Sequence, residues 1–212
     1  MKLNLTVDEV LSTTRAVRRR LDVTRPVPRA LLEECLELAL QAPNGANRNE
    51  WRWIIADDPE LVAKLAAEYK AAMGVYQGSR TGAAALTDAV PGGDRIATSA
   101  YALADKLHQM PAILIPLMAG RPESKSLAEQ SPMWGSILQA VWSFFLALRE
   151  RGLGSVWTTV ASRREKQIAE LLGIPHDRYT QVGMFPIAYT VGTDFKKVYR
   201  KPVSEVLSYN GF

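Results

Sequence analysis

The sequence contains little cysteine and histidine. Cys35 is the single cysteine among 212 residues, and His108 and His176 are the two histidines. One cysteine excludes an internal disulfide and a cysteine-based metal cluster, and it is typical of a reducing compartment. Because the histidines belong to no HExxH motif or Cys/His spacing, we expect no metal site. Cys35 has no flanking basic residue, so it is expected to be a small apolar core residue and not a nucleophile.

Long apolar runs are also missing. The longest one, residues 110–119, is short and contains Pro111 and Pro116, so it cannot span a bilayer. Residues 1–8 have no apolar core of the kind found in export signals. The sequence therefore predicts a soluble, cytoplasmic protein without a membrane partner.

Motifs for nucleophilic or phosphate chemistry are absent as well. The sequence contains no Gly-x-Ser-x-Gly elbow and no Walker A motif. Gly152 and Gly154 lack the third glycine of a dinucleotide-binding fingerprint and precede a predicted strand. With no convincing nucleophile or acid–base pair, the chemistry is expected to come from a cofactor.

The chain is mildly basic, with a formal net charge of +4 at pH 7. This favours anionic partners but does not select nucleic acid over a phosphorylated small molecule. The basic run at residues 15–20 has no interleaved aromatic residues, so we expect no nucleic-acid binding.

Hydrophobic periodicity predicts interleaved helices and strands, in an α/β or α+β arrangement, within one domain over residues 1–212. Helix 133–149 is apolar nearly all round, which predicts burial on several sides, partly by a second subunit. Long loops are expected at 76–93 and 120–130. Helices are expected at 7–19, 29–41, 59–73, 94–109, 133–149 and 164–172, and strands at 51–56, 112–118, 155–160 and 184–191.

Residues 42–52 form the most informative segment. Pro43 ends the preceding helix, and Asn44, Gly45 and Asn47 tolerate turn and left-handed geometry. The two asparagine amides can bind the polar rim of a flat heterocycle. Taken alone, the segment is equally well interpreted as an ordinary connector.

Five segments that are separated along the chain together resemble the nitroreductase family of FMN-dependent NAD(P)H oxidoreductases. The resemblance implies an α+β fold with a central mixed or antiparallel sheet flanked by helices. It also implies a homodimer with the long apolar helix at its interface, and two FMN sites each lined by both subunits. The segments are Arg15-Ala16-Val17-Arg18-Arg19, Pro43 to Trp51, Gly152 to Thr159, Leu172-Gly173-Ile174-Pro175 and Tyr199-Arg200-Lys201-Pro202.

The same resemblance implies which residues bind FMN. Arg15 and Arg200 match a phosphate clamp, for which the planar arginine fork is suited. Arg18 matches a position at the pyrimidine edge of the ring, and a backbone N–H near Thr159 is expected to reach flavin N5. N5 carries the chemistry, with Arg18 and Thr159 tuning it, so no side chain is predicted to be catalytic. The implied cofactor-binding set is Arg15, Ala16, Arg18, Asn44, Gly45, Asn47, Trp157, Thr158, Thr159 and Arg200, with core packing as the alternative for Trp157.

The implied reaction is ping-pong hydride transfer from NADH or NADPH through FMN to a small electron-poor acceptor, such as a nitroaromatic or a quinone. Residues 69–93 match the variable region that covers the pocket, and the predicted substrate contacts are Ala46, Tyr69, Met73 and Tyr76. Two alternatives stay open: a specialised branch (a reductive dehalogenase or a flavin-fragmenting enzyme), and a flavin-holding regulatory or storage protein. The sequence departs from the family pattern at Ala16, Asn49, Glu50 and Thr158-Thr159.

Overall fold

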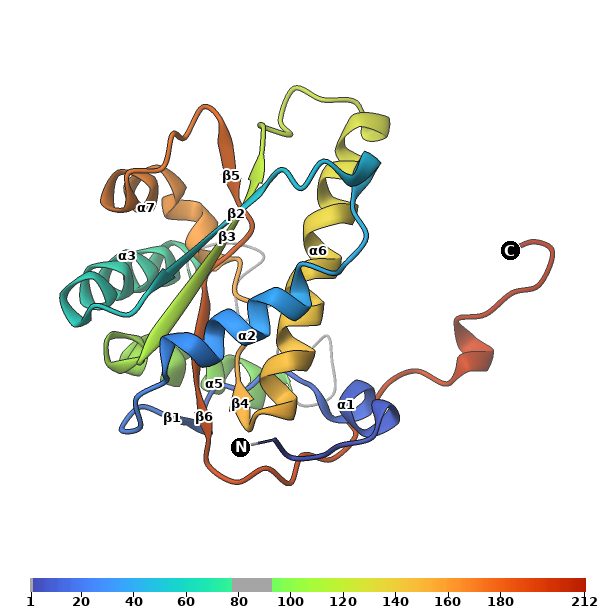
Figure 1. Ribbon diagram of the computed structural model, residues 1–212, viewed down its shortest axis with the longest axis horizontal. Coiled ribbons are helices and arrows are strands. Elements are labelled where there is room, and N and C mark those ends of the chain that lie inside the picture. The colour runs from blue at the N-terminus through green and yellow to red at the C-terminus, as the bar shows by residue number, and fades with distance from the viewer. Residues whose placement is uncertain (1, 78–92) are drawn as a thin grey trace.

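The fold is organised around an antiparallel sheet, shown in Figure 1 as a computed structural model that describes residues 2–77 and 93–212. The strands are β1 (Leu21–Asp22), β2 (Trp51–Ala56), β3 (Ala112–Ala119), β4 (Leu153–Gly154), β5 (Tyr179–Gln181) and β6 (Phe185–Thr190). Their order is β1-β6-β3-β2, with β4 paired to β6 and β5 paired to β3, and all of these pairings are antiparallel.

Helices cover both faces of the sheet. Figure 1 shows α2 and α6 on one side, with α3 and α7 on the other. The helices are α1 (Val7–Thr13), α2 (Arg29–Ala39), α3 (Pro59–Gln77), α5 (Gly93–Lys106), α6 (Leu127–Glu150) and α7 (Glu165–Leu172). The 3₁₀ turns in the described residues are η1 (Gly45–Asn47), η2 (Leu107–Gln109), η3 (Val160–Arg164) and η4 (Val203–Glu205).

Strand β3 divides the core into two clusters, because successive side chains of a strand point to opposite faces. Ile113, Ile115 and Leu117 belong to the cluster that contains residues of α3 and α7. Leu114 and Met118 belong to the cluster that contains residues of α2 and α6. The predicted α+β class with a central antiparallel sheet flanked by helices is confirmed.

Helix α6 begins earlier than residue 133, so the predicted loop 120–130 is wrong from Leu127 onward. A capping box explains the early start. The Ser126 hydroxyl accepts from the Glu129 N–H, and the Glu129 carboxylate accepts from the Ser126 N–H at 2.9 Å. The box satisfies backbone donors that would otherwise be free at the helix end.

Two other elements differ from their predicted extents because of contacts distant in sequence. The predicted helix 7–19 ends at Thr13, and the Val17 N–H donates to the Ser155 carbonyl at 2.8 Å instead of continuing the helix. The predicted strand 155–160 is wrong: β4 covers Leu153–Gly154, and Thr158 makes one isolated bridge to Met184.

The remaining helices lie close to their predicted positions, with α3 extending to Gln77 and α5 beginning at Gly93. Residues 78–92 of the predicted loop 76–93 lie outside the described residues. No helix in the described part of the chain is long and apolar enough to cross a membrane.

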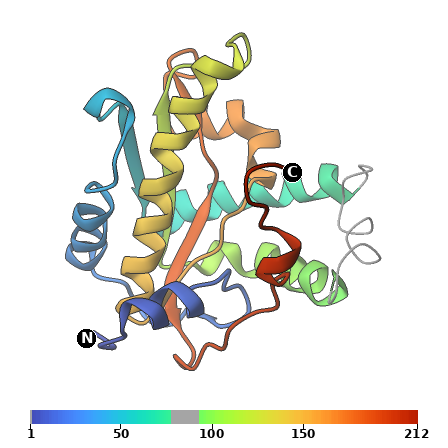
Figure 2. The same ribbon diagram turned by 90° about the vertical axis from the view of Figure 1, so that its right-hand side faces the viewer.

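The chain after β6 leaves the body of the molecule. Figures 1 and 2 show it running past α1 and projecting outward to the C-terminus. Phe195 is anchored between two arginines, with Arg20 4.3 Å and Arg149 5.1 Å from its ring centroid. From Tyr199 onward every residue is exposed, including the apolar and aromatic residues Tyr199, Val203, Val206 and Tyr209.

Candidate functional site

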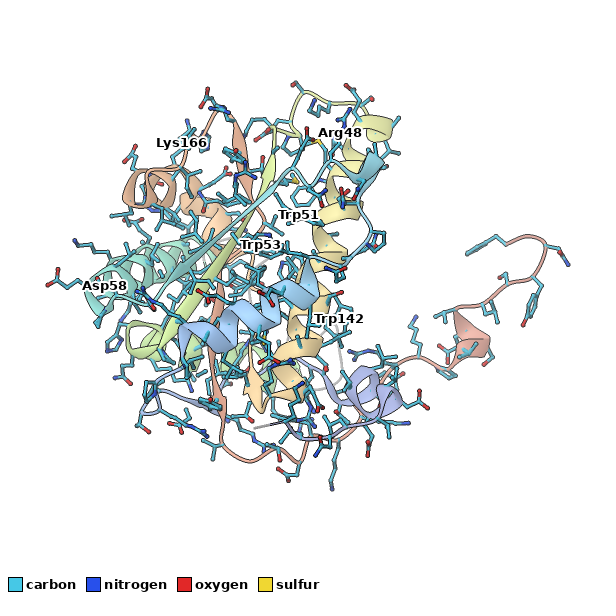
Figure 3. The ribbon with its side chains drawn as sticks, in the orientation of Figure 1. Arg48, Trp51, Trp53, Asp58, Trp142 and Lys166 are labelled. Atoms are coloured by element: carbon cyan, nitrogen blue, oxygen red, sulfur yellow. The ribbon has the colours of Figure 1, made fainter. Side chains whose placement is uncertain are left out.

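A cavity of about 730 Å³ lies between the segment 44–51 and the N-terminal half of α6. Figure 3 labels Arg48 and Trp51 near the N-terminal half of α6, and Trp142 nearer the C-terminal end of the helix. The Gly45 N–H donates to the Ser136 hydroxyl at 2.9 Å, and a Cβ at Gly45 would lie 3.4 Å from Pro132 Cβ. The segment therefore lies directly against α6 at Gly45. The segment lines the cavity with Asn44, Gly45, Ala46, Arg48, Glu50 and Trp51, and α6 adds Met133 and Ser136 among others.

The segment has an unusual backbone. Ala46, Asn47 and Asn49 all have φ between 52° and 54°, in the left-handed region that costs a residue with a Cβ about 1 kcal/mol or more. The amide of Asn44 holds this shape, because its Oδ1 accepts from the Asn49 N–H at 2.9 Å and its Nδ2 donates to Asn49 Oδ1 at 3.2 Å. Asn49, one of the departures from the family pattern, thus organises the loop. The Asn44 amide is partly used inside the loop, and its contact with FMN stays a prediction.

A second group joins Arg18, Tyr69 and Thr158. Tyr69 is buried beside Thr158, whose hydroxyl donates to the Met184 carbonyl at 2.6 Å. Burial raises the pKa of Tyr69, while Thr158 and the positive charge of Arg18 act in the opposite direction. Burial lowers the pKa of Arg18, and Tyr69 opposes that effect. The structure therefore brings two predicted cofactor-binding residues together with one predicted substrate residue.

The predicted substrate residues on α3 are covered in this chain. Tyr69 and Met73 pack in the core, so their predicted contact with a substrate would require a conformational change. Tyr76 is partly buried, with Arg163 5.2 Å from its ring centroid. Ala46, by contrast, lines the large cavity.

Trp157 packs against Phe185, with ring centroids 5.0 Å apart in an edge-on arrangement. Its ring contributes to the core cluster next to α6, as the alternative interpretation of this residue expected. Thr159 is exposed, and its carbonyl accepts from the Ser162 N–H at the start of η3.

A third group surrounds a small cavity of about 10 Å³ near the C-terminal end of α6, lined by Arg15, Arg149 and Ser155 among others. Arg149 Nη1 and Ser155 Oγ are buried and have no hydrogen-bond partner. Unpartnered donors beside an exposed arginine fit an oxyanion, such as the phosphate of FMN. Sequence reasoning missed both residues: Arg149 belongs to no motif, and Ser155, although inside the segment Gly152 to Thr159, was assigned to a strand and not to the site.

The three groups occupy different parts of one chain. Gly45 contacts Ser136 on α6, whereas Arg15 shares a cavity with Arg149 on the same helix. Ser136 and Arg149 are 13 residues apart, which corresponds to about 20 Å along α6. Arg200 lies on the projecting C-terminal chain, where its Nη1 donates to the Tyr199 carbonyl at 2.8 Å. Ala16 is exposed beside Arg15. Across residues 2–77 and 93–212, no cluster of three His, Cys, Asp or Glu residues is placed to hold a metal.

Several solved structures share this architecture. The nitroreductase-like family protein from Bacillus cereus is 21% identical, with 100% of both chains covered and a TM-score of 0.68. Oxidized iodotyrosine deiodinase bound to FMN and 3-iodo-L-tyrosine is 23% identical, covering 95% of this chain and 98% of its own, with a TM-score of 0.71. A variant of the FMN- and NADPH-dependent nitroreductase NfnB from Sphingopyxis sp. strain HMH is 20% identical, and the match covers 98% of this chain and 100% of that one, with a TM-score of 0.71. At these identities the likeness concerns the fold alone.

The sequence model of the Nitroreductase family matches residues 11–189. The chain therefore belongs to the nitroreductase family, whose members are generally FMN-dependent oxidoreductases. The resemblance carried by the five sequence segments is confirmed. A search among curated proteins gives no match.

Proposed function

We propose that this protein is an FMN-dependent NAD(P)H oxidoreductase that reduces small, flat, electron-poor acceptors such as nitroaromatics and quinones. The observation that carries the proposal is the cavity of about 730 Å³ beside Asn44, Gly45 and Ala46, within a chain that belongs to the nitroreductase family. Its volume lies in the range of small-molecule sites. FMN, when bound, would supply the hydride transfer.

The residues of this chain would bind and orient the cofactor. Gly45 would present its backbone to the cofactor, and Arg18 would stabilise negative charge on the reduced ring from its partly buried position. Tyr69 and Thr158, both buried, would hold the surroundings of Arg18 in place, with Thr158 fixed by its hydrogen bond to the Met184 carbonyl. Arg15 and Arg200 would bind the phosphate.

We also propose a homodimer in which each FMN site uses residues of both subunits. Helix α6 exposes Leu138 and Trp142, one turn apart, with 41% of Trp142 accessible. The C-terminal chain carries exposed apolar residues together with Arg200, and it projects away from its own body (Figure 1). A second subunit would cover both surfaces and bring Arg200 to a site that one chain leaves incomplete.

The first experiment is an absorption spectrum of the purified protein, followed by NAD(P)H oxidation with a nitroaromatic or quinone acceptor. We expect a flavin spectrum and acceptor-dependent turnover. A protein that stays colourless after incubation with FMN would contradict the proposal. Anaerobic turnover of halotyrosines, or loss of intact flavin in air, would indicate a specialised branch, and bound flavin without turnover would indicate a storage or regulatory protein.

Substitution of Arg200 tests the phosphate clamp. Arg200→Ala should weaken FMN binding by about tenfold or more, because a hydrogen bond to a charged group is lost. Arg178→Ala is the matched control, since Arg178 is an exposed arginine outside the three groups. Equal FMN affinity in the two variants would remove Arg200 from the clamp.

A further inference from the structure

Four buried side-chain polar atoms in the described part of the chain have no hydrogen-bond partner, and two of them lie on one cavity. These two are Arg149 Nη1 and Ser155 Oγ, on side chains of residues that are 6% and 4% exposed. A buried donor without a partner costs free energy that a ligand can recover. The two residues come from the end of α6 and from the segment after β4, which converge beside Arg15.

The positive charge of Arg149 is not compensated by a neighbouring carboxylate. Its Nε donates to the Thr13 hydroxyl at 3.1 Å and its Nη2 to the Thr193 carbonyl at 3.0 Å, both neutral oxygens. None of the ion pairs found in residues 2–77 and 93–212 involves Arg149.

The two carboxylates that influence Arg149 electrostatically are engaged elsewhere. Glu9 accepts from the N–H and hydroxyl of Thr6, in the capping box of α1. Glu150 accepts from the backbone N–H groups of Asn4 and Leu5. A buried arginine that keeps its charge and lacks an anion is expensive, which favours binding of an anion from outside the chain.

We propose that Arg149 and Ser155, together with Arg15, form a recessed subsite for a phosphoryl oxygen. The enclosed space of about 10 Å³ admits one atom of the size of a water oxygen. One oxygen of the phosphoryl group would enter between Arg149 and Ser155, while the rest of the group stays at the opening beside exposed Arg15. Ser155 would thus supply a hydroxyl donor close to Ala16, which has none.

The phosphoryl group could belong to FMN or to free phosphate, and the assignment to FMN rests on the proposed function. Titration of the apoprotein with FMN and with riboflavin, which lacks the phosphate, separates the two contributions. We expect Arg149→Lys and Ser155→Ala each to weaken FMN binding by about 10- to 100-fold, with riboflavin binding changed by less than about twofold. Ser155→Ala removes a hydroxyl that has no partner, so it should fold like the wild-type protein.

Arg151→Met is the matched control for removal of a buried arginine. Arg151 is equally buried, but its Nη2 donates to the Glu34 carboxylate at 2.5 Å and it does not line this cavity. The control should lower stability without changing the ratio of FMN to riboflavin affinity. If Arg149→Lys and Ser155→Ala change both affinities equally, or neither, the subsite is refuted while flavin binding stands.

Inorganic phosphate tests the subsite without flavin. Phosphate should raise the melting temperature of the wild-type apoprotein more than chloride at equal ionic strength, and this excess should disappear in Ser155→Ala and Arg149→Lys. A phosphate effect in a protein that binds no flavin would support the subsite and contradict the proposed function. Equal effects of phosphate and chloride in all variants would show that the cavity holds water, and would overturn the subsite.

Discussion

The ion-pair network between the segment after β3 and helix α7 permits a quantitative prediction. Glu165 accepts from Arg121 Nη1 at 2.7 Å and Nη2 at 3.1 Å, and from the Gln181 N–H at 3.2 Å. The side chains of Arg121 and Glu165 are 22% and 17% exposed. Arg121 also contacts Glu123, which is 60% exposed.

Glu165→Gln removes the charge that faces Arg121 and keeps the shape of the side chain. Loss of one partner of a fully buried ion pair costs about 3–5 kcal/mol. Because both side chains keep some solvent contact and glutamine retains neutral hydrogen bonds, we expect a loss of about 2–3 kcal/mol. In a chain of this size that corresponds to a decrease in melting temperature of about 5–10 °C.

The same substitution has a predictable pH dependence. Burial acts to raise the pKa of Glu165, but hydrogen bonds from Arg121 and Gln181 and the charges of Arg121 and His176 outweigh it, so the pKa is lowered. A lowered pKa in the folded state means that the carboxylate stabilises the fold above its unfolded pKa of about 4.3 and loses this effect as the pH falls through the folded value. The difference between wild type and Glu165→Gln should therefore be full at pH 7 and shrink below about pH 4.

Urea unfolding at fixed protein concentration, between pH 7 and pH 3, measures both quantities. Glu123→Gln is the control, since it removes an exposed partner of the same arginine and should cost less than about 1 kcal/mol. Equal losses in the two variants, or a loss for Glu165→Gln that does not depend on pH, would refute the reasoning.

Three further predictions concern single residues. Ala46→Gly should stabilise the protein by about 0.5–1 kcal/mol because φ at Ala46 is 52°, whereas Ala63→Gly, at an exposed position of α3, should destabilise it. The same sign for both substitutions would contradict the backbone argument. Trp142→Asp should shift the proposed dimer toward monomer in sedimentation, while Lys166→Asp on α7 should not. Cys35 is fully buried and its pKa is raised to about 11, so alkylation at pH 8 should require denaturant; rapid labelling of the folded protein would disprove this.

Local patterns predicted the parts of the fold that local physics determines. The aromatic and β-branched residues at 51–56 and the continuous apolar run at 112–118 predicted β2 and most of β3, because such residues favour strands and a short apolar run suits a buried strand. The predicted helix 7–19 is longer than α1, because the Val17 N–H donates to the carbonyl of Ser155, a residue remote in sequence. No periodicity encodes such a contact.

The same limit applies to the candidate site. Asn44 and Gly45 could be selected from turn chemistry, and both line the large cavity. The hydrogen bond between Gly45 and Ser136, and the unpartnered Arg149 Nη1 beside Ser155, depend on where α6 passes the rest of the chain. Residues that meet only through tertiary packing leave no signal in one sequence.

The position of β6 in the sheet has a consequence for synthesis on the ribosome. β6 lies between β1 and β3, pairing Thr190 with Leu21 and Ile187 with Ala112. Because β1 and β3 both precede β6 in the chain, they are made before the strand that joins them. Until then β3 lacks a partner along part of its length, and the apolar surface of α6 is incompletely covered. The nascent chain should consequently fold late and depend on chaperones, with its aggregation risk concentrated in the interval before residue 190 leaves the exit tunnel.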